Sequence, residues 1–151
     1  MSKIGLDVSK TNKKFKSNSQ CVVFYYARKE EMKPDIGHVY TVLRHWATAE
    51  KARPQTYTQL SHDYHALTGE WYKPHGNWDA PLGELNKLLA SVSAPALSAL
   101  VVLQETKEPG DGFWGCAPNV PHRPKKDIER LTEWSLIVAA IGKYKWPTTL
   151  P

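Results

Sequence analysis

The side chains best suited to chemistry at neutral pH are histidines, and two of them lie three residues apart. His62 and His65 fall in a stretch expected to be helical, where this spacing places both side chains on one face and suits zinc ligation. The sequence contains no CxxC, HExxH or other closed ligand motif that would complete such a site. We therefore predict no metal and no other cofactor, and we expect both histidines on a solvent-exposed helix face.

A second group of reactive side chains lies in the segment PGDGFWGCAPNVPHRPKKD. It contains Asp111, Asn119, His122, Arg123 and Lys125. A histidine among cations can cleave RNA by general acid–base catalysis, with the cations stabilising the negatively charged transition state. A small metal-independent nuclease or toxin that uses His122 is therefore one functional hypothesis. A basic surface loop explains the same residues, so we assign no catalytic residue and consider a non-enzymatic protein the better interpretation.

A third set of side chains suits nucleic-acid binding. The free N–H groups at a helix start near Thr56 can hold a phosphate, and the second helix of a helix-turn-helix enters the major groove. Asn side chains read adenine there, and Lys meets guanine or phosphate. Asp79 and Glu84 on the outward face of that second helix oppose binding of a polyanion. The predicted nucleic-acid contacts are Thr56, Tyr57, Asn77, Trp78, Asn86, Lys87, Arg123, Lys125 and Lys126.

The spacing of apolar residues predicts four helices that position these side chains. Their expected ranges are 38–50, 56–68, 80–92 and 127–141, each with an apolar stripe at helical spacing. Thr56 and Gln59 form a capping-box pattern at the start of the second helix, and Gly69 follows its end. Strands are predicted at 21–26, at 97–103 and in the short aromatic segment 113–116.

The order of these elements predicts the fold. Helix, helix, strand, the Pro109-Gly110 turn and an aromatic strand follow one another as in a winged helix. We therefore predict an α+β, winged-helix-like core of three to four helices with a small antiparallel sheet. Residues 1–20 are polar and lysine-rich and are expected to form a basic, flexible arm, and residues 21–151 are expected to form a single domain.

Composition narrows the class of protein. The 151 residues carry a formal net charge of +5, which suits an anionic partner. The sequence contains no run of 18 apolar residues, so no membrane span is predicted. Residues 1–16 lack the apolar core of a secretory signal, so a cytoplasmic location is expected. Cys21 and Cys116 could pair, but with no export signal we expect two free thiols.

Several short motifs resemble one known family. They are Thr56-Tyr57-x-x-Leu60, Gly83 within a helix, Pro95-x-Leu97, Val101-Val102 and Pro109-Gly110-x-Gly112-Phe113. Together they cover about residues 38–115 and resemble the C-terminal domain of the O6-alkylguanine-DNA alkyltransferases and alkyltransferase-like proteins. The resemblance implies a winged helix that binds the DNA minor groove and flips a base. The pattern LSALVV…PGxGFW is also similar to that of small uncharacterised bacterial proteins.

The departures from that family concern its chemistry. Its Pro-Cys-His-Arg motif would fall on 97–100, which here reads Leu-Ser-Ala-Leu. Ser98 would stand nearest the nucleophilic cysteine, but a serine without a base is not an activated nucleophile. The arginine that fills the gap left by the flipped base would fall near Ala80, which is too small. Tyr57 is retained among the base-handling residues, and Trp78 is a candidate replacement wedge.

Three functions are compatible with these residues. The first is a non-enzymatic DNA-binding protein of the winged-helix, alkyltransferase-like type. The second is a protein-interaction module, for example a small protein of phage–bacterium conflict that inhibits or assembles with another protein. It would use exposed aromatic side chains as anchors, with Trp71, Tyr72 and Trp78 forming one patch. The third is the nuclease or toxin that uses His122.

Overall fold

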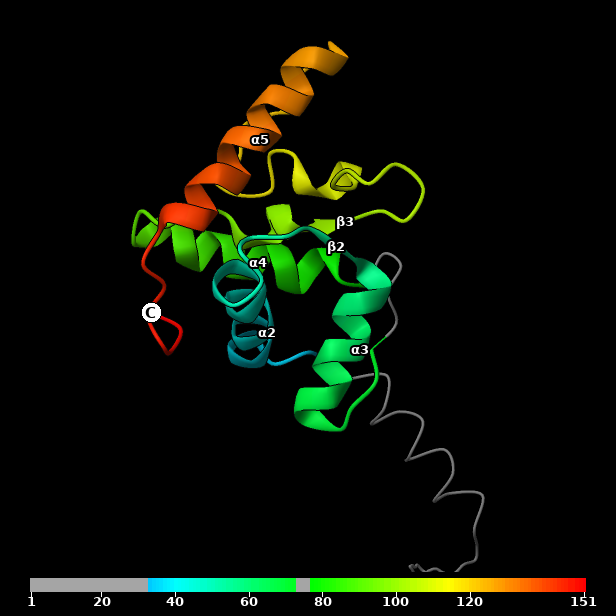
Figure 1. The fold of residues 1–151 in the computed structure, drawn as a ribbon, viewed down its shortest axis with the longest axis vertical. Helices are drawn as coiled ribbons and strands as arrows, with labels where there is room; N and C mark the ends of the chain where they lie inside the picture. Colours follow the sequence, from blue (N-terminus) through cyan, green and yellow to red (C-terminus); the bar gives the residue numbers. More distant parts are fainter. Residues whose placement is uncertain (1–32, 73–76) are drawn as a thin grey trace, which may run out of the picture. The chain divides into compact units, whose positions relative to one another are not determined.

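The computed structural model describes residues 33–72 and 77–151. Contacts divide the chain into Met1–Lys33 and Pro34–Pro151, and every described helix and strand belongs to the second unit. The predicted basic arm and the predicted strand 21–26 lie outside the described residues. The second unit has an α+β fold with four α-helices, two short 3-10 helices and a two-stranded sheet among the described residues (Figure 1).

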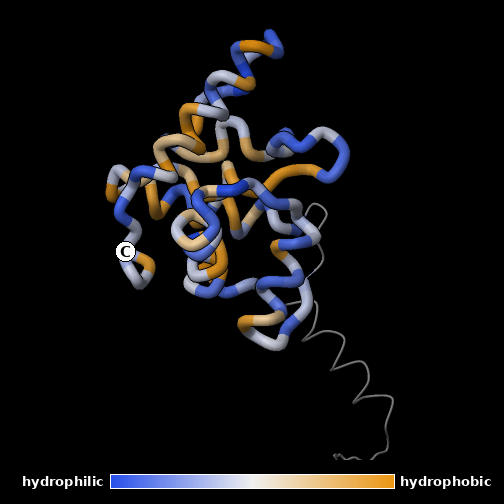
Figure 2. The backbone as a smooth tube through the Cα atoms, in the orientation of Figure 1, coloured by the Kyte–Doolittle hydropathy of each residue, from blue (hydrophilic) through white to orange (hydrophobic). Residues whose placement is uncertain are grey.

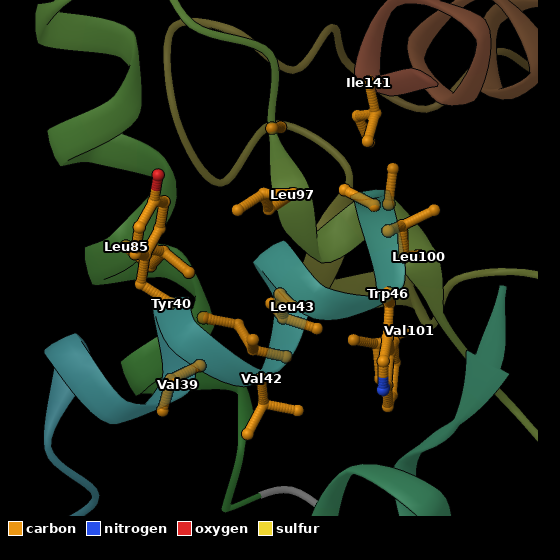
Figure 3. Packing of buried hydrophobic residues seen from close by; sticks show 14 of the residues in the cluster. Val39, Tyr40, Val42, Leu43, Trp46, Leu85, Leu97, Leu100, Val101 and Ile141 are labelled. Carbon is orange, nitrogen blue, oxygen red and sulfur yellow. The ribbon is translucent and has the colours of Figure 1, made fainter. Parts of the chain in front are cut away.

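Helix α2, Ile36–Thr48, lies at the centre of the core. It begins at Asp35, whose side chain accepts a hydrogen bond from the backbone N–H of His38. Its apolar positions recur at helical spacing and are buried along the helix, at Val39, Tyr40, Val42, Leu43, Trp46 and Ala47. Figure 3 shows these side chains meeting apolar residues from α4, α5 and the first 3-10 helix in one cluster.

Helix α3, Tyr57–Thr68, has the termini that the sequence predicts. The Thr56 hydroxyl accepts a hydrogen bond from the backbone N–H of Gln59 at 3.1 Å. The Gln59 side chain donates to Asp63 instead of returning to the start of the helix, so half of the predicted capping box is present. Gly69 ends the helix with φ of 79°, a left-handed conformation that glycine adopts without strain.

Two further helices complete the helical part. Helix α4, Asp79–Ser91, has Pro81 in its first turn and buries Leu82, Leu85 and Leu89. Helix α5, Asp127–Lys143, contacts the core through Ile141, its one buried residue, and through the partly buried Trp134, Ile137 and Val138. All four predicted helices are therefore confirmed, with no end shifted by more than two residues. No helix in the described residues is both long and apolar enough to cross a membrane.

The sheet differs from the prediction in direction and extent. Strand β2, Gln55–Thr56, pairs with strand β3, Val101–Val102, and the two run parallel, so the predicted antiparallel sheet is wrong. Parallel strands need a crossover connection, and α3 and α4 provide it. The predicted strand 97–103 is also mostly helical, because Leu97–Leu100 form the 3-10 helix η1 before β3 begins.

The predicted aromatic strand 113–116 is absent from the described residues. The chain turns between Leu103 and Glu108, where the Leu103 N–H donates to the Glu108 carbonyl at 2.8 Å. It then forms the 3-10 helix η2, Asp111–Phe113. Gly112 packs against the Asp79 carboxylate so closely that a Cβ would lie 2.7 Å from its Oδ2. Gly112 therefore packs η2 against the start of α4, and the Pro109-Gly110 turn does not form a wing.

Thr56 gives a direct test of how α3 begins. The change Thr56→Ala removes the hydroxyl that satisfies the Gln59 N–H, so the free energy of unfolding should fall by about 1 kcal/mol. Urea denaturation followed by circular dichroism measures this loss. Thr58→Ala is the matched control, because Thr58 is exposed within the same helix and should change stability by no more than about 0.5 kcal/mol. Equal losses would contradict the capping role.

Candidate functional site

Tyr57 lies at a small pocket between α3, α4 and the two 3-10 helices. The pocket is lined by Tyr57, Asp79, Leu82, Gly83, Ser98, Gly112, Phe113 and Cys116, and its volume is about 10 Å³. This volume is near the minimum for a single water molecule. A flipped nucleobase therefore has no room beside Tyr57 in this conformation.

A hydrogen-bonded polar group closes the floor of this pocket. Asn86 on α4 donates through Nδ2 to Ser98 Oγ on η1 at 2.6 Å, and its side-chain oxygen accepts from the Ser98 backbone N–H at 3.4 Å. Asn86 Nδ2 also lies 3.3 Å from Cys116 Sγ. Asn86 is fully buried and Ser98 is 4% exposed, so the pair satisfies polar groups inside the core.

The Tyr57 hydroxyl is held in its protonated form. Burial raises the pKa of Tyr57 to about 12, and the nearby Asp79 and Cys116 act in the same direction, while the backbone N–H of Gly110 acts in the opposite one. A phenol with this pKa neither attacks as a nucleophile nor accepts a proton near pH 7.

Helix α4 does not present the surface that was predicted to contact nucleic acid. Trp78 and Asn86 are both 0% exposed, so their side chains cannot reach DNA and their predicted contacts are wrong for this conformation. Asn77 and Lys87 are exposed as expected, but Asp79 and Glu84 are exposed on the same helix. Acidic side chains at this surface oppose the approach of phosphates. The sequence missed the burial because an Asn within a helix and a Trp at a helix start are as typical of contact residues as of the core.

The loop before α5 places its basic side chains in solvent. His122, Arg123, Lys125 and Lys126 are all exposed, and Arg123 makes one contact of 3.6 Å with the Asp111 carboxylate. Lys126 is the N-cap residue of α5 and makes no side-chain capping hydrogen bond. An N-terminus with this arrangement offers backbone N–H groups and three cations to an anion, although Asp127 and Glu129 lie in the same first turn.

The residues of the nuclease hypothesis are not assembled into one site. Asn119 turns toward the interior, where its Nδ2 donates to the Ala94 carbonyl at 3.1 Å, while His122 is exposed. Trp71 packs against both histidines of α3, with its ring stacked on the half-buried His65 at 3.9 Å and edge-on to the exposed His62 at 5.4 Å. No group of three or more metal-ligating side chains occurs within the part of the chain that the structure describes.

The aromatic patch expected of a protein-interaction module is divided between surface and core. Trp71 is 61% exposed, but Tyr72 is half-buried and packs edge-on against the buried Trp78 at 4.8 Å. Trp71, Tyr72 and Trp78 therefore do not form the exposed patch that would favour a protein-interaction module.

Positive charge is concentrated outside the described fold. Among the described residues, Lys and Arg are as numerous as Asp and Glu. The net charge of +5 therefore arises in residues 1–32 and at Lys73. Within the described part, the run from Arg123 to Lys126 is the densest basic segment.

Comparison with family models, with curated proteins and with solved structures gives no match to this chain.

Proposed function

We propose that the protein binds DNA without enzymatic activity, through contacts to the phosphate backbone. The observation that supports this best is the exposed basic loop at the start of α5, with Arg123, Lys125 and Lys126 beside a helix N-terminus that has no side-chain cap. Lys and Arg that neutralise phosphates release counterions, which gives affinity without sequence recognition. The lysine-rich residues 1–20 add further cations to the same interaction.

The proposed mode of binding differs from base flipping. The pocket beside Tyr57 is about 10 Å³, and the outward surface of α4 carries Asp79 and Glu84. Neither feature favours insertion of a base or of α4 into a groove. Thr56 and Tyr57 serve the start of α3 and the core in this proposal, while Asn77 and Lys87 remain peripheral candidates for contact.

Neutralising the basic loop tests the proposal. The triple variant R123Q/K125Q/K126Q should bind duplex DNA more weakly at about 50 mM salt, with a slope of log K against log salt reduced by up to about 3. Fluorescence anisotropy titrations over a range of salt concentrations measure both quantities. The unmodified protein should lose affinity steeply as salt rises.

A matched triple variant separates a specific surface from net charge alone. Lys33, Arg53 and Lys145 are exposed and lie elsewhere in the described part, and K33Q/R53Q/K145Q removes the same charge. This variant should retain most of the slope. An equal loss in both variants would show that the loop is not a binding surface, and no binding by the unmodified protein at about 50 mM salt would refute the proposed function.

A further inference from the structure

Helix α5 exposes apolar side chains that a helix in a small domain normally buries. Ile128 is 75% exposed, Leu136 is 60% exposed and Leu131 is 41% exposed. The helix is nevertheless fixed in place, because Trp134 Nε1 donates to the Ala99 carbonyl at 2.8 Å and Arg130 bonds the Glu108 carboxylate at 2.8 Å. Figure 2 shows apolar segments along α5 as far as its N-terminal end. Ile128 and Leu131 lie about 80° and about 140° around the helix axis from Leu136, so the three side chains do not form one face. Leu136 is therefore the exposed apolar side chain of its own face of this firmly held helix.

The outward residues of α5 are arranged symmetrically about Leu136. Glu129 lies seven residues before Leu136 and Lys143 lies seven residues after it, and all three are exposed. Seven residues are close to two turns of an α-helix, so the three side chains project from the same side. Thr132 and Ala139, which are also exposed, occupy the positions between them. Among the described residues, neither Glu129 nor Lys143 takes part in an ion pair.

A groove of about 410 Å³ runs beside this surface, and Leu136 forms part of its wall. Its lining is mostly apolar and includes Pro95, Pro118, Leu136 and Ile137. Leu136 thus projects beside an apolar groove that could receive a side chain from another surface. A surface with both features can fit a second copy of itself.

We propose that α5 docks against α5 of a second copy of this chain, antiparallel, about a two-fold axis at Leu136. In this arrangement each Glu129 faces the partner's Lys143, so the two ends of the contact carry two equivalent ion pairs. Leu136 lies at the centre and packs against its symmetry mate and the rim of the partner's groove. A parallel arrangement would place Glu129 against Glu129 and Lys143 against Lys143, so charge selects the antiparallel pair. The contact is small, and the dissociation constant should lie in the micromolar range.

Sedimentation of the full chain without DNA, at protein concentrations from about 5 to about 300 µM, measures this association. A monomer–dimer equilibrium is expected, and Leu136→Glu should leave a monomer at every concentration. Leu88→Glu is the matched control, because Leu88 is 41% exposed on α4 and should leave the dimer intact. A thermal melt by circular dichroism verifies that both variants are folded.

A charge exchange tests the antiparallel register. Glu129→Lys and Lys143→Glu, each alone, place like charges together and should weaken the dimer about 5-fold or more at low salt. The double variant E129K/K143E restores opposite charges at both ends and should return the dissociation constant to within about 2-fold of the original. A monomer at all concentrations, a dimer that persists in Leu136→Glu, or no recovery in the double variant would each overturn the proposal.

Discussion

Replacing Trp78 by alanine should lower the free energy of unfolding by about 3–5 kcal/mol. The indole is fully buried at the start of α4, and its Nε1 donates to Ser61 Oγ at 3.0 Å. Tyr64 and Tyr72 pack edge-on against it at 5.6 and 4.8 Å. Alanine would leave a large cavity and remove the hydrogen bond that Ser61 Oγ accepts, although the Ser61 hydroxyl still donates to the Tyr72 carbonyl at 2.9 Å. Urea denaturation followed by circular dichroism measures the loss.

Two further variants separate this structural role from a role in DNA contact. Trp71→Ala removes an indole that is 61% exposed, so its cost should be within about 0.5 kcal/mol. Trp78→Phe keeps an aromatic ring in the core and should cost less than alanine while leaving DNA affinity unchanged. If Trp78→Phe weakened DNA binding at full stability, Trp78 would be a contact residue and the buried conformation would not be the one that binds.

The helices could be predicted from the sequence because their signals are local. Thr56 and Gly69 mark the two ends of α3 through the chemistry of a hydroxyl cap and a left-handed glycine. The apolar stripe of α2, from Val39 to Trp46, has a clear helical spacing and is buried as that spacing requires.

The sheet could not be predicted because its signals are not local. Residues 97–102 are all buried, so the run shows no alternation that would distinguish a strand from a 3-10 helix. The direction of β3 depends on the path of the chain through α3 and α4. The turn at Pro109-Gly110 suggested a hairpin, but Gly112 is required by the Asp79 carboxylate of another element.

The candidate site was predicted only in part for the same reason. Arg123, Lys125 and Lys126 are exposed, as a run of charged residues normally is. Asn86 was assigned to the surface by its residue type, whereas its partners Ser98 and Cys116 are 12 and 30 residues away. A buried polar group is recognisable only when its partners are known.

The Asn86–Ser98 pair should show strong energetic coupling. Asn86→Ala leaves the Ser98 hydroxyl and backbone N–H without partners in the core and should cost about 2–4 kcal/mol. Ser98→Ala should cost about 1–2 kcal/mol, and the double variant should cost less than the sum by about 1–2 kcal/mol. Free energies of unfolding for the four proteins complete this double-mutant cycle.

The same cycle decides whether Ser98 is a structural or a reactive group. By the predicted resemblance to the alkyltransferases, Ser98 would stand nearest the reactive cysteine, and in the structure its Oγ lies 2.6 Å from Asn86 Nδ2. A hydroxyl that accepts this bond inside a closed core has no base to activate it. Asn86→Leu, which fills the same space without polar atoms, should still destabilise the protein because the Ser98 N–H stays unpaired. Additive costs across the cycle would mean that Asn86 does not hold Ser98, and the structural assignment of the hydroxyl would lose its basis.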